Sequence, residues 1–351
     1  MSRKIVITGC CGTIGQGLLE VLAERADMDA VLGIDNNESG LFALSQTYSG
    51  PFSFVFGDVR DERRLETLFA GVDTVIHTAA LKHVSSCELS PTEAVKTNVL
   101  GVTNVIAAAR AARVGKVLFT SSDKAVNPTN VMGTSKLMGE RLMSAAQADA
   151  SSVIFSSTRF GNVLGSHGSV FPLFLRQIAA GGPVTVTDPD MTRFVMNTRE
   201  AVNLVLESVE LALGGEVFVS RMRALRIGDL ARVMIDRLAP VYGRKPADIA
   251  IRIIGSRPGE KLYEELLTEE ESGRTLHLNK FYVILPAFRD LYSIEYRYAD
   301  AREHPRGEIY RSSEQPLMSP EEIAAYLEAG GLLPPVYARE GSEAWTPKSI
   351  F

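Results

Sequence analysis

Lys4-Ile5-Val6-Ile7-Thr8-Gly9-Cys10-Cys11-Gly12-Thr13-Ile14-Gly15 is the stretch that decides the fold, because an apolar strand runs into a glycine-rich turn and the start of a helix. Glycines at this point permit a tight turn, a close approach of the backbone to a ligand and dense packing of helix on strand. The N-terminus of the helix then faces a pyrophosphate. The spacing is G-x-x-G-x-x-G instead of the commoner G-x-G-x-x-G, so neighbouring motifs have to support this interpretation.

The ends of the next predicted strands give that support. Asp35 ends the second strand, twenty residues after Gly15, where a carboxylate accepts hydrogen bonds from ribose hydroxyls. The residues next to it include no arginine to pair with a 2′-phosphate, which favours NAD over NADP. The alternative is a set of turn glycines with a capping aspartate. We predict that the following residues bind the cofactor: Gly9, Gly12, Thr13, Ile14, Gly15, Asp35, Asn36, Asp58, Val59, Ala79, Ala80, Lys82, Asn98 and Lys136.

Short apolar runs alternate with helical patterns through the first half of the chain. Strands are predicted at 5–8, 30–34, 52–56, 74–77, 117–120 and 153–158, and helices at 15–25, 61–70, 92–112 and 134–148. This alternation is typical of βαβ units with a parallel sheet covered on both faces. We therefore predict an α/β fold, a Rossmann-type doubly wound parallel sheet with a smaller C-terminal substrate-binding lobe.

The regular alternation of strands and helices becomes less clear after about residue 165, which suggests a second lobe. We predict an NAD-binding Rossmann domain at 1–176, a substrate-binding lobe at 177–290 and a C-terminal tail at 291–351. A helix at 199–212 and a strand at 216–219 are expected within 195–225, which returns to the first domain, and a helix at 226–238 belongs to the second. Ser319-Pro320-Glu321-Glu322 indicates the start of one helix in the tail, at 319–328.

Composition excludes several classes of protein. The chain has 351 residues, 45% of them apolar, and a formal net charge of −5, which argues against binding to nucleic acid or to a membrane surface. No stretch reaches the ~20 apolar residues of a membrane span. We expect no signal peptide ahead of the first strand. Three cysteines without framework or metal-ligand spacing favour a reducing cytoplasm and no metal site.

A second motif lies at the end of the fifth predicted strand, in Thr120-Ser121-Ser122-Asp123-Lys124-Ala125. The carboxyl ends of strands in an open α/β sheet are where ligands bind. Neighbouring side chains of a strand point to opposite faces, so Ser122, Asp123 and Lys124 converge only if the chain leaves extended geometry. Asn127-Pro128 favours such a break. The alternative is a surface Asp–Lys pair of little energetic weight.

Further candidates surround this motif. Met132 and Lys136 are four residues apart and share one helix face. A lysine there can donate to the cofactor's ribose and lower the pKa of a nearby hydroxyl. Lys82 and His83 follow the fourth strand near the mouth of the site, unless they are a solvated lysine and a helix-capping histidine. Asn98 faces the same region from a helix, in a cofactor-binding or a structural role.

The chain resembles the extended short-chain dehydrogenases/reductases, and among them the nucleotide-sugar 4,6-dehydratases of polysaccharide biosynthesis. The resemblance covers about 3–285. It is carried by Ser121-Ser122-Asp123-Lys124-Ala125-Val126-Asn127-Pro128-Thr129-Asn130, Thr158-Arg159-Phe160-Gly161-Asn162-Val163, Thr187-Asp188-Pro189-Asp190-Met191-Thr192-Arg193-Phe194 and Arg257-Pro258-Gly259-Glu260-Lys261. Most of the superfamily has Tyr-x-x-x-Lys, whereas this chain has Met132 and Lys136. It is thereby similar to the methionine-containing branch that acts on UDP-N-acetylglucosamine with retention at C5.

The resemblance implies a reaction and roles for the catalytic candidates. NAD oxidises C4 of the sugar, the C5 proton is removed, water leaves from C6, and the hydride returns to C6. By position Asp123 is the acid at the C6 hydroxyl and Lys124 the base at C5. Ser122 holds the C4 oxygen, and in the absence of the tyrosine we hypothesise that it deprotonates the C4 hydroxyl with the help of Lys136.

The remaining expectations concern the substrate and competing functions. Arg193, Arg257, Asn162 and Glu260, with Lys82 and His83, are expected to bind the nucleotide sugar, since arginine forks match phosphate; charges at a solvent-exposed helix start are the alternative. A nucleotide-sugar 4-epimerase or reductase, a non-catalytic NAD-sensing protein, and the same dehydration on a GDP-linked sugar stay open. We expect a homo-oligomer, a dimer or higher.

Overall fold

The computed structural model describes residues 3–148, 152–166, 168–256, 258–288, 291–292 and 294–333, and they fall into two compact units. The first unit consists of Met1–Phe160, Ala201–Arg221 and Leu266–Ile309, and the second of Gly161–Glu200, Met222–Glu265 and Tyr310–Phe351. These boundaries differ from the expected ones at 176 and 290. The second unit begins sixteen residues earlier, and strands near residue 280 extend the sheet of the first unit as antiparallel neighbours.

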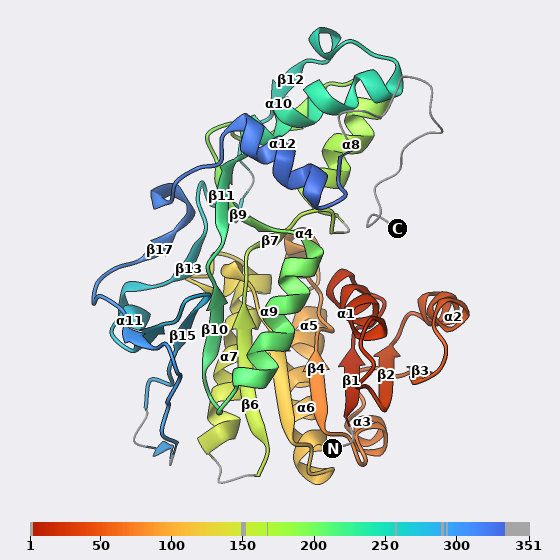
Figure 1. Cartoon of the computed structure of the whole chain (residues 1–351), viewed down its shortest axis with the longest axis vertical. Helices are drawn as coiled ribbons and strands as arrows, with labels where there is room; N and C mark the ends of the chain where they lie inside the picture. Colours follow the sequence, from red (N-terminus) through yellow and green to blue (C-terminus); the bar gives the residue numbers. More distant parts are fainter. Residues whose placement is uncertain are drawn as a thin grey trace. The chain divides into compact units, whose positions relative to one another are not determined.

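The first unit is built on a ten-stranded sheet in the order β16-β14-β15-β10-β6-β5-β4-β1-β2-β3 (Figure 1). All pairs from β3 to β10 are parallel, and those from β10 to β16 are antiparallel. The strands are β1 (Lys4–Thr8), β2 (Ala30–Asp35), β3 (Phe52–Phe56), β4 (Thr74–His77), β5 (Lys116–Thr120), β6 (Ile154–Arg159), β10 (Val217–Ser220), β14 (Thr275–His277), β15 (Phe281–Ile284) and β16 (Arg302–Glu303).

Helices connect these strands, as expected for a doubly wound sheet. They are α1 (Thr13–Ala23), α2 (Glu38–Thr47), α3 (Glu62–Leu68), α4 (Val84–Leu89), α5 (Pro91–Ala94), α6 (Gly101–Ala111), α7 (Val131–Ala148), α9 (Thr198–Leu211) and α11 (Glu269–Ser272). One core cluster joins apolar side chains of α3, α6 and α7 to those of β1, β4, β5 and β6. In Figure 1, α9 crosses in front of strands that α5 and α6 lie behind. The predicted α/β fold is therefore confirmed.

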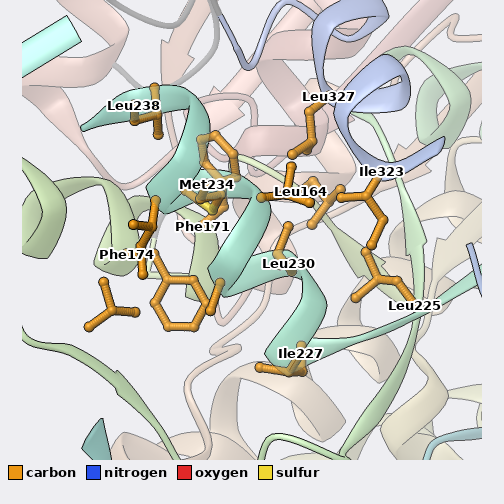
Figure 2. Close-up of a cluster of buried hydrophobic side chains, with 14 of the residues drawn as sticks. Leu164, Phe171, Phe174, Leu225, Ile227, Leu230, Met234, Leu238, Ile323 and Leu327 are labelled. Carbon is orange, nitrogen blue, oxygen red and sulfur yellow. The ribbon is translucent and has the colours of Figure 1, made fainter. Parts of the chain in front are cut away.

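The second unit has its own apolar core. It contains α8 (Val170–Ala180), α10 (Ile227–Leu238), α12 (Pro320–Ala329), a sheet of β11 (Arg223–Arg226), β9 (Thr192–Met196) and β7 (Asn162–Val163), and the pair β12 (Ile251–Ile253) and β8 (Val184–Val186). Figure 2 shows Phe171 and Phe174 of α8 and Ile323 and Leu327 of α12 around α10. Ser319 caps α12 by a capping box with Glu322, at the predicted helix start. Two further short strands are β13 (Glu265–Leu267) and β17 (Tyr310–Arg311).

Candidate active site

The turn between β1 and α1 leaves no room for side chains at two of its glycines. Gly9 has φ +76°, and a Cβ there would lie 2.6 Å from the backbone nitrogen of Ala79. A Cβ at Gly15 would lie 2.6 Å from the Cα of Cys10. Helix α1 begins after Gly12 without a side-chain cap and without an acidic residue in its first turn. Its N-terminus therefore keeps the positive end of its dipole available to an anion.

A cavity of about 310 Å³ lies at the carboxyl ends of β1, β2, β3 and β4. It brings together these predicted cofactor-binding residues: Gly9, Gly12, Asp35, Asn36, Asp58, Val59, Ala79 and Ala80. The Asp35 carboxylate accepts from the backbone N–H of Cys11 at 2.9 Å and of Asn37 at 3.0 Å. These bonds fix its position at the edge of the cavity, where a ribose diol fits a carboxylate acceptor.

Arg60 also lines this cavity, and sequence reasoning missed it. Its guanidinium donates to the Glu93 carboxylate at 2.7 Å and to the Thr97 hydroxyl at 2.7 Å. Only the tertiary structure brings these partners to it, because they follow it by more than thirty residues. The one available signal was its place directly after Asp58-Val59. An arginine is thus present in the cavity, and it is bound to a carboxylate and a hydroxyl.

Two thiols lie beside Asp35. The side-chain ligand atoms of Cys10, Cys11 and Asp35 all lie within 4.8 Å of one another, a grouping that the sequence spacing did not indicate. Burial raises the pKa of the Cys11 thiol to about 11, with a further contribution from the charge of Asp35. Both thiols are therefore protonated at neutral pH, since burial also raises the pKa of Cys10.

The second motif leaves extended geometry, as the sequence predicted. Strand β5 ends at Thr120, and Asp123–Ala125 form a single 3₁₀ turn. The Ser122 hydroxyl donates to Oδ1 of Asp123 at 2.6 Å, and Nζ of Lys124 donates to the same oxygen at 3.0 Å. The Asp123 side chain is 0% exposed and that of Lys124 is 27% exposed. The three groups therefore meet at one carboxylate oxygen.

The other carboxylate oxygen of Asp123 is unsatisfied. Among the described residues, its Oδ2 is buried and has no hydrogen-bond partner. A buried carboxylate oxygen without a partner is costly and needs an explanation, such as a ligand or an ordered water. A surface Asp–Lys pair would not bury its carboxylate, so the structure excludes that reading of the motif.

Lys136 and Met132 lie on the buried side of α7. Nζ of Lys136 donates to the Thr120 carbonyl at 2.9 Å and lies 4.7 Å from the centre of the Phe119 ring. Burial lowers the pKa of Lys136 to about 8. Met132 is buried in an apolar cluster with Cys87 and Ala94. The helix therefore presents a buried amine at the end of β5, and a thioether without acid–base chemistry one turn earlier.

Asn98 holds the loop after β4 in place by hydrogen bonds. Its side-chain amide accepts from the Leu81 N–H at 2.8 Å and donates to the Leu81 carbonyl and to the Ser135 hydroxyl, both at 2.9 Å. It belongs to a π-helical segment, Val95–Leu100, of a type that is frequent at functional sites. These bonds give Asn98 a positioning role. Lys82 and His83 lie just ahead of α4 with exposed side chains, and His83 makes no side-chain cap.

His77 is a buried polar residue that the sequence reading left unassigned. Its Nδ1 lies 2.7 Å from the Thr8 hydroxyl, which joins the ends of β4 and β1. Burial lowers the pKa of His77 to about 3, and the charge of Lys136 acts in the same direction. The imidazole is therefore neutral, and its contact with Thr8 holds the two strand ends together.

The predicted substrate-binding residues of the second unit differ in exposure, and Arg193 is buried. The Arg193 guanidinium donates to the carbonyls of Thr192 at 2.7 Å and Lys261 at 2.8 Å, and its Nε lies 3.5 Å from the Glu264 carboxylate. Asn162 lies in β7, and Glu260 is exposed. Arg257 lies outside the described residues. A phosphate-binding role for Arg193 stays a prediction, because backbone carbonyls already occupy its donors.

Across the described segments, no helix combines the length and the apolar character that crossing a membrane requires.

Comparisons with known proteins agree on one group. A family model described as polysaccharide biosynthesis protein matches residues 5–286. An uncharacterized membrane protein of Methanocaldococcus jannaschii is 49% identical over 287 residues, 81% of this chain and 86% of that protein. A UDP-glucose 4-epimerase of Rickettsia canadensis is 38% identical over 302 residues, 84% of this chain and 86% of the epimerase. A UDP-N-acetylglucosamine 4,6-dehydratase (inverting) of Campylobacter jejuni is 36% identical over 291 residues, 82% and 84% of the two chains.

Solved structures extend this likeness. The crystal structure of Pen from Bacillus thuringiensis has a TM-score of 0.88 and 37% sequence identity, and the match covers 95% of this chain and 99% of Pen. DesIV, a dTDP-glucose 4,6-dehydratase from Streptomyces venezuelae with NAD bound, has a TM-score of 0.67 at 22% identity and covers 74% of this chain and 87% of its own. The DesIV match is a likeness of fold.

Proposed function

This chain belongs to the polysaccharide biosynthesis protein family of the extended short-chain dehydrogenases/reductases, and we propose that it is an NAD-dependent nucleotide-sugar 4,6-dehydratase. Its family contains both nucleotide-sugar dehydratases and epimerases. We further propose UDP-N-acetylglucosamine as substrate and UDP-2-acetamido-2,6-dideoxy-hexos-4-ulose as product. The Campylobacter relative named for that substrate supports this choice.

The observation that carries the proposal is that Nζ of Lys124 donates to Oδ1 of Asp123, so that an amine and a carboxylate lie side by side. Loss of water across C5–C6 needs a base at C5 and an acid at the C6 hydroxyl. An epimerase returns the hydride to C4 and needs no such pair. The Rickettsia epimerase is as similar in sequence as the dehydratase, so a 4-epimerase stays the alternative, and identity alone does not separate the two.

The residues of the cavity fit NAD. Gly9 and Gly15 form a cradle that a Cβ would fill, α1 offers its N-terminus to the pyrophosphate, and Asp35 offers a ribose acceptor. Bound there, NAD would supply the oxidant for C4 and the reductant for C6. Lys136 is proposed to hold the nicotinamide ribose from the end of β5, and Asn98 to keep the Leu81 loop in place beneath the cofactor.

The catalytic roles follow from the three side chains that meet at the end of β5. Lys124 removes the C5 proton, which is acidic beside a C4 ketone, and Asp123 protonates the departing C6 hydroxyl. Ser122 binds the C4 oxygen. Met132 cannot take part, so no tyrosine-type base acts from α7. We propose that the nucleotide sugar is bound by Asn162, Arg193, Arg257, Glu260, Lys82 and His83. We also propose that the protein is cytoplasmic and forms a homo-oligomer.

The proposal is tested by incubating the NAD-loaded protein with UDP-N-acetylglucosamine and measuring the molecular mass of the product by mass spectrometry. A mass lower by one water supports a dehydratase, whereas a product of unchanged mass with inverted C4 supports an epimerase. NMR of a product formed in heavy water also reports the C5 configuration. The same assay with a GDP-linked hexose tests the choice of nucleotide.

The Lys124→Met variant tests the base directly. We expect water loss to slow by about 10²- to 10⁴-fold, the usual contribution of a general base. Lys280→Met is the matched control, because Lys280 is an exposed lysine paired only with Glu207 among its described contacts. Full activity of Lys124→Met would remove this residue from the mechanism.

A further inference from the structure

Two thiols in the turn between β1 and α1 occupy space that glycines of neighbouring elements leave open. A Cβ at Gly33 of β2 would lie 2.9 Å from the sulfur of Cys10, and a Cβ at Gly40 of α2 would lie 2.8 Å from the sulfur of Cys11. Cys10 is fully buried, whereas Cys11 is half-buried and lines the cavity at the ends of β1 to β4. The thiols therefore face β2 and α2, and a ligand in the cavity can reach them from the side of Cys11.

Strand β2 adds a carboxylate to the two thiols. Gly33 and Asp35 are two residues apart in this strand, so they lie on the same face of it. The sulfur atoms of Cys10 and Cys11 and a carboxylate oxygen of Asp35 all lie within 4.8 Å of one another. The sequence spacing did not indicate a metal site, because the third group comes from a different strand.

This set of donors suits a thiophilic divalent cation. Zinc binds thiolate sulfur at about 2.3 Å and carboxylate oxygen at about 2.0–2.2 Å, and sites with three protein ligands keep the fourth position for a water. Ligand atoms at these distances lie about 3.5–3.8 Å apart around a tetrahedral metal, so the three groups need to close by little more than about 1 Å. Magnesium and calcium prefer oxygen ligands alone, so the two sulfur atoms select against them.

The Asp35 carboxylate is already oriented for such a ligand. The backbone N–H groups of Cys11 and Asn37 each donate to one of its oxygens, at 2.9 Å and 3.0 Å. Bonds of this kind fix a metal-ligating carboxylate, and each oxygen keeps a further lone pair. The ribose of NAD is proposed to use the same lone pairs. A metal with its bound water would therefore stand where the ribose has to enter.

We propose that Cys10, Cys11 and Asp35 form a zinc-type metal site whose occupant excludes NAD from the cavity. The proposal goes beyond the dehydratase reaction and rests on the proposed NAD site. Binding breaks two S–H bonds, forms two metal–sulfur bonds and one metal–oxygen bond, and releases two protons to the solvent. The sulfur atoms keep their oxidation state, so no oxidant or reductant takes part. The metal lowers the affinity for NAD, and NAD lowers the affinity for the metal by the same factor.

The first measurement is a calorimetric titration of metal-free and cofactor-free protein with zinc chloride, in the presence of a phosphine that keeps thiols reduced. We expect one zinc ion per chain. Cobalt(II) is the spectroscopic probe, because thiolate ligands give it a sulfur-to-metal charge-transfer band in the near ultraviolet. This band reports the ligands directly and does not depend on enzymatic activity.

Cys11→Ser tests the ligand set, because it keeps the backbone N–H and the size of the side chain. Zinc affinity should fall by at least about 10- to 100-fold, since even the loss of an indirect partner of a metal ligand has that effect. Cys10→Ala should do the same, which keeps the test valid if one variant folds poorly. Cys87→Ala is the control, because Cys87 lies in a separate apolar cluster, and it should bind zinc like the wild type.

The second measurement is a titration with NAD in the absence and presence of zinc. With free zinc at about ten times its dissociation constant, the apparent dissociation constant of NAD should rise about tenfold in the wild type. The same zinc concentration should leave the NAD affinity of Cys11→Ser unchanged.

Two results would overturn the metal site: zinc binding that persists in Cys11→Ser and Cys10→Ala, and an NAD affinity of the wild type that saturating zinc does not alter. Metal-free protein that fails to bind NAD would instead contradict the proposed function. The two failures are therefore distinct, since zinc binding is measured without the cofactor.

Discussion

The ends of β1 and β5 are two loops of the same parallel sheet, and they are built on opposite principles. The loop after β1 works through its backbone: Gly9 and Gly15 leave no space for a Cβ, and no side chain caps α1. The loop after β5 works through side chains, which meet one another at Oδ1 of Asp123. The first loop is therefore sensitive to added atoms, and the second to a changed hydrogen-bond partner.

Gly15→Val should produce the largest effect, because it adds atoms where a Cβ would lie 2.6 Å from the Cα of Cys10. We expect a loss of about 1–3 kcal/mol or more in the free energy of unfolding from overpacking. NAD binding should fall below detection, measured by calorimetry with the folded fraction. Gly273→Ala is the control, since the nearest atom to its Cβ would be 3.8 Å away; equal NAD affinity in both variants would contradict a backbone-built site.

Lys136→Met tests the region at the end of β5, because it removes a buried charge there. The pKa of Lys136, about 8 in the folded chain against an ordinary 10.5, means that the unfolded chain binds more protons between these pH values. Stability should therefore rise from about pH 8 to about pH 10.5, by on the order of 3 kcal/mol, through this group alone. The cost of charging it is fully present below pH 8.

The measurement is denaturant unfolding of cofactor-free protein at about pH 7 and about pH 10. The difference in stability between Lys136→Met and the wild type should change across this range by up to that amount, in favour of the wild type at high pH. The exposed Lys280→Met should show no such change. A pH-independent difference would mean that Lys136 is solvated in solution.

Asn98→Ala should give the smallest effect of the three. It leaves the N–H and carbonyl of Leu81 without their side-chain partner, which costs about 1–3 kcal/mol when such groups stay buried. We expect a weaker affinity for NAD from a looser Leu81 loop. Asn104→Ala removes one bond, to the Val59 carbonyl, and should cost less. A larger loss in Asn104→Ala would remove the special role of Asn98.

The parallel strands could be predicted from sequence because each is a short apolar run between turn signals. The helix Glu38–Thr47 was not predicted, since it contains Gly40 and buries only Leu41 and Leu44. The sequence also gave no sign that β14 and β15 join the first sheet. Strand β15 pairs antiparallel with β10, which is a long-range contact, and β14 pairs with β15. Strands of three or four residues carry too little periodicity to reveal such pairing.

The candidate site also contains features that the sequence predicted and features that only the structure revealed. The glycine spacing, Asp35 and the Ser122-Asp123-Lys124 run were visible as local patterns. Arg60 in the cavity at the ends of β1 to β4 was not, because Glu93 and Thr97, which hold it, are distant in sequence. Arg193 suggested a phosphate ligand, and in the structure its donors meet the carbonyls of Thr192 and Lys261. Residue type indicates what a side chain can bind, and the fold decides what reaches it first.

The sequence by itself determined the βαβ architecture, the dinucleotide-type turn and the identity of the acid, amine and hydroxyl at the end of β5. These are local properties, since glycine sterics, strand alternation and residue order act over a few positions. Only the tertiary structure decided that Ser122 turns to Asp123, that Lys136 is buried against Thr120 and Phe119, and that one oxygen of Asp123 has no described partner. Burial and hydrogen-bond direction depend on neighbours that the chain brings together from afar.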